Sequence, residues 1–345
     1  PIIQLMNSLL TIQKRSISYG VFHLCWFLVQ SISIVVALAF LGDGLRGQVI
    51  AQLFSNAIFG GVALVILLRY AKPQFSAGLT KPLLGFGIPL LPSFVCIWID
   101  SGAGRFALEA YSALSELGIF LLASQFAGIV GLLATSVEKA LLPYFLRAAS
   151  RENAPHELGT SILRFIGSLT LLATSLILFA PTVIVLISTP AYFESIQYVA
   201  PLTLAALLYA VRLPIAWSLT HSQHPGHISM INGVASITLV ALLMVMLGNW
   251  GLGIMGVAYA TIVVNCVVLI VGTTTAQFSF RIVLPMARLV GLLCIPAICW
   301  LFVPVRTSSV LEPTILARNT VILIVAAVMI LALSRLTDIK QLFHE

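Results

Sequence analysis

Charged residues are scarce in this chain, and their scarcity excludes a water-soluble globule. Only 8% of the 345 residues are charged, whereas 60% are hydrophobic. A typical soluble domain carries about 25% charged residues. The longest polar stretch, at about 138–164, is also too short to form a soluble domain of its own. The composition therefore predicts a polytopic membrane protein.

Recognisable catalytic and cofactor motifs are also lacking. The chain has no GxxxxGK[ST], HExxH or GxSxG motif. Its five cysteines lie in apolar runs without CxxC spacing, which favours packing roles over disulfides or metal ligands. An HxxHxxH set, His221, His224 and His227, is interrupted by Pro225 and Gly226 and has no nearby carboxylate, which favours a solvated turn. We expect no enzyme active site, no cofactor and no metal.

What the chain does have is ten long apolar runs. Runs of about 18–25 apolar residues are long enough to cross a bilayer core of about 30 Å as helices. The predicted fold class is therefore an all-α polytopic membrane protein with about ten complete transmembrane helices. The runs lie at about 17–41, 48–68, 83–99, 117–137, 165–189, 196–218, 228–248, 251–273, 284–303 and 319–334.

The basic residues avoid every second gap between these runs. By the positive-inside rule, the face that receives most lysines and arginines is cytoplasmic, and an even number of spans places the C-terminus there too. The net charge of +7 is thus a topological signal, and no clustered patch for nucleic acid is visible. The other face receives Arg46, Arg105, Arg306 and Arg318, while Arg212 and Arg288 fall inside runs.

A polar, proline-containing segment at 69–82 predicts a cytoplasmic linker between two helical bundles. On this interpretation, 1–68 is the remainder of an N-terminal bundle and 83–274 is a six-helix bundle, followed at 284–345 by two additional helices and a cytoplasmic tail. Transporters are commonly built from two related halves with the substrate site between them. The imbalance predicts an incomplete N-terminal bundle.

Arg212 is the most informative charge, because it lies inside the run 196–218. An arginine at membrane depth costs at least about 2.5 kcal/mol and should face a water-filled cavity or a partner. Tyr209 lies three residues back on the same helix face, and Pro214 can open the helix locally. A guanidinium suits an anionic group such as phosphate. A structural pair with a carboxylate, or a position nearer the surface, is the alternative.

Other polar residues gather near span ends. Trp98, Asp100 and Arg105 cluster at the outer end of the run 83–99, where the two charges could form an exposed ion pair of little energetic value. Glu138 and Lys139 follow the run 117–137, either marking the inner interface or facing a cavity.

The stretch from Leu84 to Arg147 resembles bacterial polysaccharide flippases of the O-antigen (Wzx) type, within the multidrug/oligosaccharidyl-lipid/polysaccharide exporter superfamily. Two positions depart from the family pattern: Gly104 stands where the Asp of an Asp-Arg pair is usual, and Phe120 replaces a common Tyr. Asp100 offers a carboxylate one turn earlier. The matching residues are Gly87, Pro89, Leu90, Pro92, Trp98, Arg105, Gly118, Ile119 and Pro143.

The resemblance implies a two-bundle, MATE-like fold in which the ten runs are helices five to fourteen and residues 1–12 end helix four. It implies a flippase that carries an undecaprenyl-diphosphate-linked oligosaccharide across the bacterial inner membrane, for O-antigen, lipopolysaccharide or exopolysaccharide synthesis. Membrane lipids, a polysaccharide polymerase and a chain-length regulator are the implied partners. Arg212 would attract the diphosphate in a cavity between the bundles, and Trp98, Gln125, Tyr209 and Trp217 would contact sugars.

Two other interpretations stay open. A multidrug or small-solute antiporter of the same fold would carry carboxylates in its first bundle, which are not evident here. A polytopic polysaccharide-biosynthesis enzyme such as a polymerase would carry a large outer loop with paired arginines. The longest outer gaps, 100–116 and 304–318, are short and weakly basic.

Overall fold

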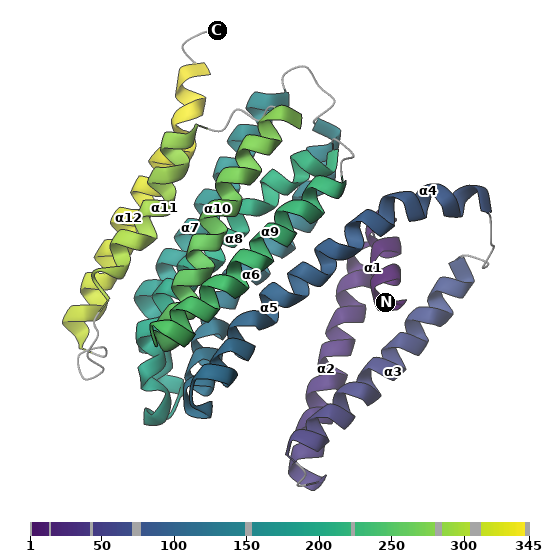
Figure 1. Ribbon diagram of the computed structural model, residues 1–345, viewed down its shortest axis with the longest axis horizontal. Coiled ribbons are helices and arrows are strands. Elements are labelled where there is room, and N and C mark those ends of the chain that lie inside the picture. The colour runs from purple at the N-terminus through teal and green to yellow at the C-terminus, as the bar shows by residue number, and fades with distance from the viewer. Residues whose placement is uncertain are drawn as a thin grey trace. The chain divides into compact units, whose positions relative to one another are not determined.

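The computed structural model is helical throughout its described part (Figure 1). It describes residues 2–13, 15–41, 44–70, 77–148, 154–221, 225–279, 285–303 and 312–341. Several helix ends are described by their backbone alone, among them 142–148, 154–157, 215–221 and 225–228. The α-helices are α1 (Ile2–Ile12), α2 (Ser16–Leu41), α3 (Leu45–Tyr70), α4 (Ala77–Gly87), α5 (Leu91–Tyr111), α6 (Leu114–Ala148), α7 (Ala154–Ile187), α8 (Ile196–His221), α9 (Pro225–Leu243), α10 (Gly253–Ser279), α11 (Met286–Trp300) and α12 (Pro313–Gln341). Short 3₁₀ turns, η1 (Ile88–Leu90) and η2 (Pro190–Ser195), precede α5 and α8, and a π-helical turn, η3 (Met244–Asn249), ends α9.

Eight helices in the described ranges are long and apolar enough to cross a membrane, and α11 is a shorter apolar helix. The prediction of an all-α polytopic membrane protein is confirmed. All ten apolar runs lie on helices, but two differ from the expected full spans. The helix α11 has only 15 residues, and the run 83–99 is divided between α4, η1 and α5, the last of which continues to Tyr111.

The chain divides into two compact units, Pro1–Pro82 and Leu83–Glu345. In the first unit α1, α2 and α3 pack around a small core of Met6, Leu10 and Ala63. Most of α2 is exposed, as expected for a helix whose apolar surface faces lipid. Within the predicted linker 69–82, α3 runs to Tyr70 and α4 begins at Ala77, and residues 71–76 are not described.

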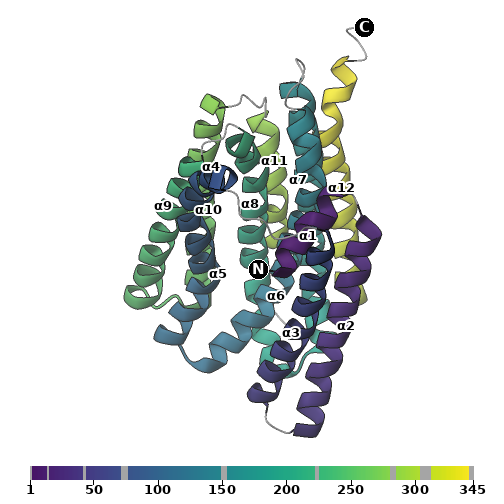
Figure 2. The same cartoon turned by 90° about the vertical axis from the view of Figure 1, so that its right-hand side faces the viewer.

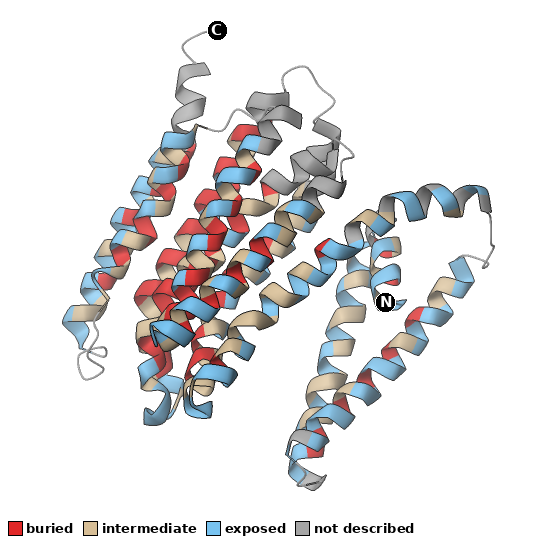
Figure 3. Ribbon diagram, viewed as in Figure 1, coloured by how far each residue is buried: buried red, intermediate tan, exposed pale blue. Residues whose placement is uncertain are grey.

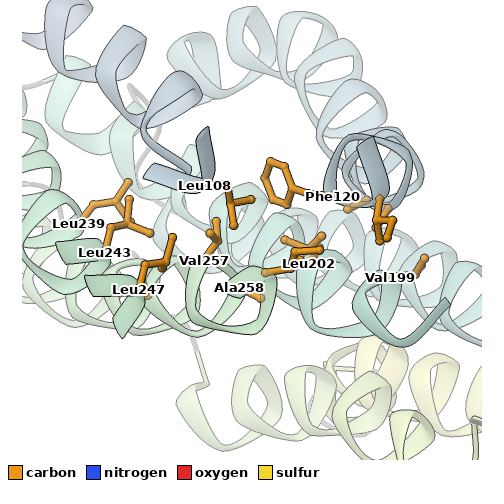
Figure 4. Packing of buried hydrophobic residues seen from close by; sticks show 14 of the residues in the cluster. Leu108, Phe120, Val199, Leu202, Leu239, Leu243, Leu247, Val257 and Ala258 are labelled. Atoms are coloured by element: carbon orange, nitrogen blue, oxygen red, sulfur yellow. The ribbon is translucent and has the colours of Figure 1, made fainter. Parts of the chain in front are cut away.

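The second unit is a bundle of α5 to α12 with two apolar cores (Figures 1 and 2). One core joins α7 to α6, α8, α11 and α12 and includes Leu163, Ile166 and Leu292. The other joins α5, α6, α8, α9 and α10 and is shown in Figure 4, where Leu108 and Val257 lie among the labelled residues. Buried residues accordingly concentrate on the inner helices of this unit (Figure 3).

Several polar groups inside these helices bond to groups within the protein, as a hydrocarbon environment favours. The hydroxyls of Thr170 and Thr174 on α7 donate to backbone carbonyls one turn earlier, at 2.8 Å each. Asn319, which is 2% exposed, donates from Nδ2 to the carbonyl oxygen of Leu178 at 2.9 Å. This bond joins α12 to α7 within the apolar interior.

Candidate functional site

A cavity of about 830 Å³ lies within the second unit, among α5, α6, α8, α9 and α10. Its lining is mostly apolar and includes members of the core in Figure 4, such as Phe120, Leu202 and Val257. An apolar cavity with a few convergent polar groups is the usual form of a ligand site. The polar side chains that line it are Ser93, Asp100, Ser101, Arg105, Ser124, Glu138, Tyr209, Arg212, Asn232, Thr261 and Asn265.

Arg212 on α8 is held at the cavity wall by two amides. Its Nη1 donates to Asn265 Oδ1 at 2.7 Å, and its Nη2 donates to Asn232 Oδ1 at 3.4 Å. Its Cζ lies 5.4 Å from the centre of the Tyr209 ring, within the range of a cation–π contact. Both acceptors are neutral, so these bonds orient the guanidinium without cancelling its charge. Among the described residues, these hydrogen bonds end on amides, and the carboxylate of Asp100 acts on the guanidinium through its charge.

The two asparagines are themselves fixed by their remaining amide groups. Asn265 on α10 is 3% exposed and donates from Nδ2 to the carbonyl oxygen of Ala205 on α8 at 3.1 Å. Asn232 on α9 donates from Nδ2 to Ser93 Oγ on α5 at 2.6 Å. Because each amide uses its oxygen for Arg212 and its nitrogen for another helix, four helices converge on one guanidinium.

Asp100 accepts a hydrogen bond from a neighbouring helix. Ser236 Oγ on α9 lies 2.6 Å from Asp100 Oδ1 and 3.1 Å from the carbonyl oxygen of Cys96. Two further hydrogen bonds join α9 to the segment that contains η1 and α5: Asn232 donates to Ser93, and Ser229 donates to the carbonyl oxygen of Pro89. The Asp100 carboxylate thus joins two helices, and its charge also acts on Arg212.

At Gly104, α5 packs tightly against α10. A Cβ built on it would lie 2.6 Å from Val257 Cγ1 and 3.5 Å from Phe120 Cζ. Ordinary carbon contacts lie at about 3.5–4.0 Å, so an aspartate at this position would not fit. The two departures from the exporter pattern, Gly104 and Phe120, are therefore neighbours in space. The exporter pattern has an aspartate at position 104 and a tyrosine at position 120. Because Gly104 and Phe120 have neither the carboxylate nor the phenol hydroxyl, their side chains leave no unpaired polar group at this contact.

The structure brings some predicted site residues together and leaves others out. Arg212, Tyr209, Asp100, Arg105 and Glu138 all line the cavity, and Asp100 and Arg105 lie within α5 instead of at the end of a span. The lining residues all belong to the second unit, whereas the sequence predicted a cavity between the two bundles.

Three other candidates do not line the cavity. Trp98 is 67% exposed and contacts Phe106, and Gln125 and Lys139 are exposed on α6. The side chains of Trp217 and of the histidine-rich loop 221–227 fall outside the part of the chain whose side chains are described.

Sequence reasoning missed Ser93, Asn232 and Asn265, which complete the surroundings of Arg212. A signal was available, because amides within apolar runs at membrane depth commonly bond across helices. Three such residues, Asn232, Asn265 and Asn319, make bonds between helices here.

Comparison with known proteins assigns the chain to a family. Residues 3–197 match a protein family described as "Polysaccharide biosynthesis protein", which is more than half of the chain. The chain belongs to this polysaccharide biosynthesis family. No curated protein and no solved structure matches it.

Membership of the polysaccharide biosynthesis family and the apolar helices together identify a multi-pass membrane protein of polysaccharide biosynthesis. The matched range includes the cavity residues of α5 and α6, among them Asp100 and Glu138. It ends just inside α8, before Tyr209 and Arg212. The family therefore supports the biological setting of the cavity, while the role of its arginine rests on the geometry.

Proposed function

We propose that this protein is a flippase that carries an undecaprenyl-diphosphate-linked oligosaccharide across the bacterial inner membrane. Three findings support the proposal: family membership in polysaccharide biosynthesis, a polytopic helical fold, and a cavity with a cation at its wall. The observation that carries it is the state of Arg212, a guanidinium bonded to neutral amides inside a mostly apolar cavity.

Arg212 is suited to a diphosphate for reasons of charge and geometry. Its two bonds to Asn265 and Asn232 use two of the five N–H donors of a guanidinium. The planar fork of donors matches phosphate oxygens and can bind them in pairs. A cation at membrane depth is costly, and an anionic substrate group offsets that cost while it is bound.

The rest of the cavity suits the first sugars of the head group. Tyr209 on α8, Ser124 on α6 and Thr261 on α10 line the cavity, and each carries a hydroxyl group. The buried Ser124 Oγ has no hydrogen-bond partner among the described residues, so it is available to a sugar hydroxyl. A cavity of about 830 Å³ lies within the range of ordinary ligand sites. It would hold the diphosphate and adjoining sugars while the lipid tail stays in hydrocarbon.

Complementation of a flippase-null strain tests the role of Arg212. We expect Arg212→Ala to reduce surface polysaccharide roughly ten- to hundredfold, the loss of a charge-assisted hydrogen bond, and Arg212→Lys to restore only part of it. Lys139→Ala, which removes an exposed cation outside the cavity, is the matched control and should behave as wild type. Wild-type polysaccharide in both Arg212 variants, at equal protein level, would remove Arg212 from the mechanism.

A reconstituted assay separates transport from enzymatic synthesis. Purified protein in liposomes receives a fluorescent diphosphate-linked sugar lipid, and its movement between leaflets is followed by quenching at the outer surface. The proposal expects faster movement with the lipid chemically unchanged. Extension or cleavage of the glycan without faster movement would instead show a biosynthetic enzyme.

A further inference from the structure

A second cavity, of about 660 Å³, lies along the seam between α7 and α12, apart from the site around Arg212. These two helices pack against each other at one side of the second unit (Figure 1). Neither the family nor the proposed function assigns this groove a role. Its lining residues are Arg164, Gly167, Ser168 and Leu171 from α7, and Ala327, Ile330, Leu331 and Ser334 from α12.

The two helices run antiparallel along the groove, which gives it a polar end and an apolar end. A Cβ built on Gly167 would lie 3.4 Å from Ile330 Cγ2 and 3.6 Å from Ser334 Cβ, so these residues lie at the same level. Further along, Asn319 bonds to the carbonyl oxygen of Leu178. The early residues of α7 therefore lie beside the late residues of α12.

This arrangement places Arg164 and Ser334 at one end of the groove, with Ser168 one turn further in, near the level of Leu331. Leu171 and Ala327 lie toward the other end, with Ile330 between, so the apolar part continues away from the guanidinium. On each helix the lining residues recur at three- and four-residue intervals, which places them on one face. The groove is therefore amphipathic along its length.

The polar end lies near one end of two candidate membrane spans. The candidate spans begin at Leu158 on α7 and end at Ser334 on α12, at the same end of the two helices. Arg164 is six residues inside the first boundary, which is about 9 Å along a helix. A long arginine side chain at this depth reaches the level of the lipid headgroups while its stem lies along apolar surface.

We propose that this groove binds an anionic glycerophospholipid, with its phosphate on Arg164 and an acyl chain along the apolar part. The guanidinium supplies the charge, the Ser334 hydroxyl lies at the same end, and the Ser168 hydroxyl follows one turn further in. The apolar wall of Leu171, Ala327 and Ile330 accepts hydrocarbon. Basic pockets between membrane helices commonly bind anionic lipid headgroups, and here charge and polarity change along the groove as they do along a phospholipid.

Native mass spectrometry of the full chain, purified in detergent and titrated with phosphatidylglycerol or phosphatidylcholine, tests the proposal. We expect Arg164→Gln to weaken phosphatidylglycerol binding about fivefold, as for the loss of one cation near a membrane surface, with little change for phosphatidylcholine. Ala327→Phe, which fills the groove and keeps the charge, should weaken the binding of both lipids.

Arg69→Gln is the matched control, because Arg69 is an exposed arginine in the last turn of α3 and does not line the groove. Equal losses in Arg164→Gln and Arg69→Gln would show non-specific charge attraction and overturn the proposal. Unchanged binding in Ala327→Phe would overturn it as well. Neither outcome bears on Arg212, so this site stands or fails independently of the proposed transport.

Discussion

The contact at Gly104 offers a sharp test of how closely α5 and α10 pack. Gly104→Ala introduces a Cβ that would lie 2.6 Å from Val257 Cγ1, closer than carbon atoms approach without displacement. Val257 is 3% exposed and belongs to the core around the cavity, so it has little freedom to move aside. We expect Gly104→Ala to destabilise the second unit.

The magnitude follows from two opposing effects. Overpacking a buried contact costs about 1–3 kcal/mol. Replacing a helical glycine by alanine contributes about 0.5–1 kcal/mol in the favourable direction. The net loss for Gly104→Ala is therefore about 0–2.5 kcal/mol, centred near 1 kcal/mol. Gly104→Asp should cost more, because it also places a charge between Val257 and Phe120.

Thermal unfolding in detergent, followed by intrinsic fluorescence, measures the effect. Gly128→Ala is the control: it too lies on the cavity wall, but a Cβ built there has no neighbour within 4 Å. It should leave the unfolding temperature unchanged or raise it slightly. In the double variant with Val257→Ala the overlap is relieved, and we expect a favourable coupling of about 1–3 kcal/mol. Equal stability of Gly104→Ala and Gly128→Ala, or no coupling, would refute the argument.

Two further predictions concern buried amides. Asn265→Ala should lower stability by roughly 1–3 kcal/mol, because two groups of α8, Arg212 Nη1 and the carbonyl oxygen of Ala205, lose their bond to α10. Asn265→Asp should keep the bond to Arg212 but cancel its charge, and it loses the donor to Ala205. Surface polysaccharide should therefore fall when compared with wild type at equal protein level. Wild-type polysaccharide in Asn265→Asp would contradict the role given to the arginine. Asn319→Ala should lower the unfolding temperature through the lost bond to α7, by roughly 1–3 kcal/mol, whereas the exposed Thr320→Ala should not. Equal shifts in these two variants would show that the buried bond contributes little.

Hydropathy predicted the helices well because membrane helices satisfy their backbone internally and need only apolar length. It predicted ends less well, as the run 83–99 shows. The first charge, Asp100, marked the end of the run, yet α5 continues to Tyr111. Charges such as Asp100 and Arg105 do not end a helix when they face a cavity, and hydropathy cannot tell a cavity from water.

Whether a residue lines the cavity depends on its rotational position around its helix, and the residue type alone does not reveal that position. Ile97, Asp100 and Gly104 line the cavity at helical spacing, whereas Trp98, chosen for its aromatic ring, lies about 100° away from Ile97 around α5. Gln125 likewise follows the lining residue Ser124 on α6 and points about 100° away from it around the helix. Arg212 could be singled out because a charge in an apolar run is costly. Its neutral partners, which lie 20 and 53 residues away along the chain, carried only the weaker signal of an amide within an apolar run.

The placement of opposite charges on different helices has an electrical consequence. Asp100 on α5 and Arg212 on α8 interact through space, but their hydrogen bonds end on Ser236 and on two asparagines. If α5 and α8 move together, the two charges cross the membrane field as a neutral pair and no net work is done. If one helix slides past the other, a positive and a negative charge separate along the field. Moving one unit charge through 100 mV is worth about 2.3 kcal/mol, so the membrane potential itself would favour one arrangement of the cavity over the other.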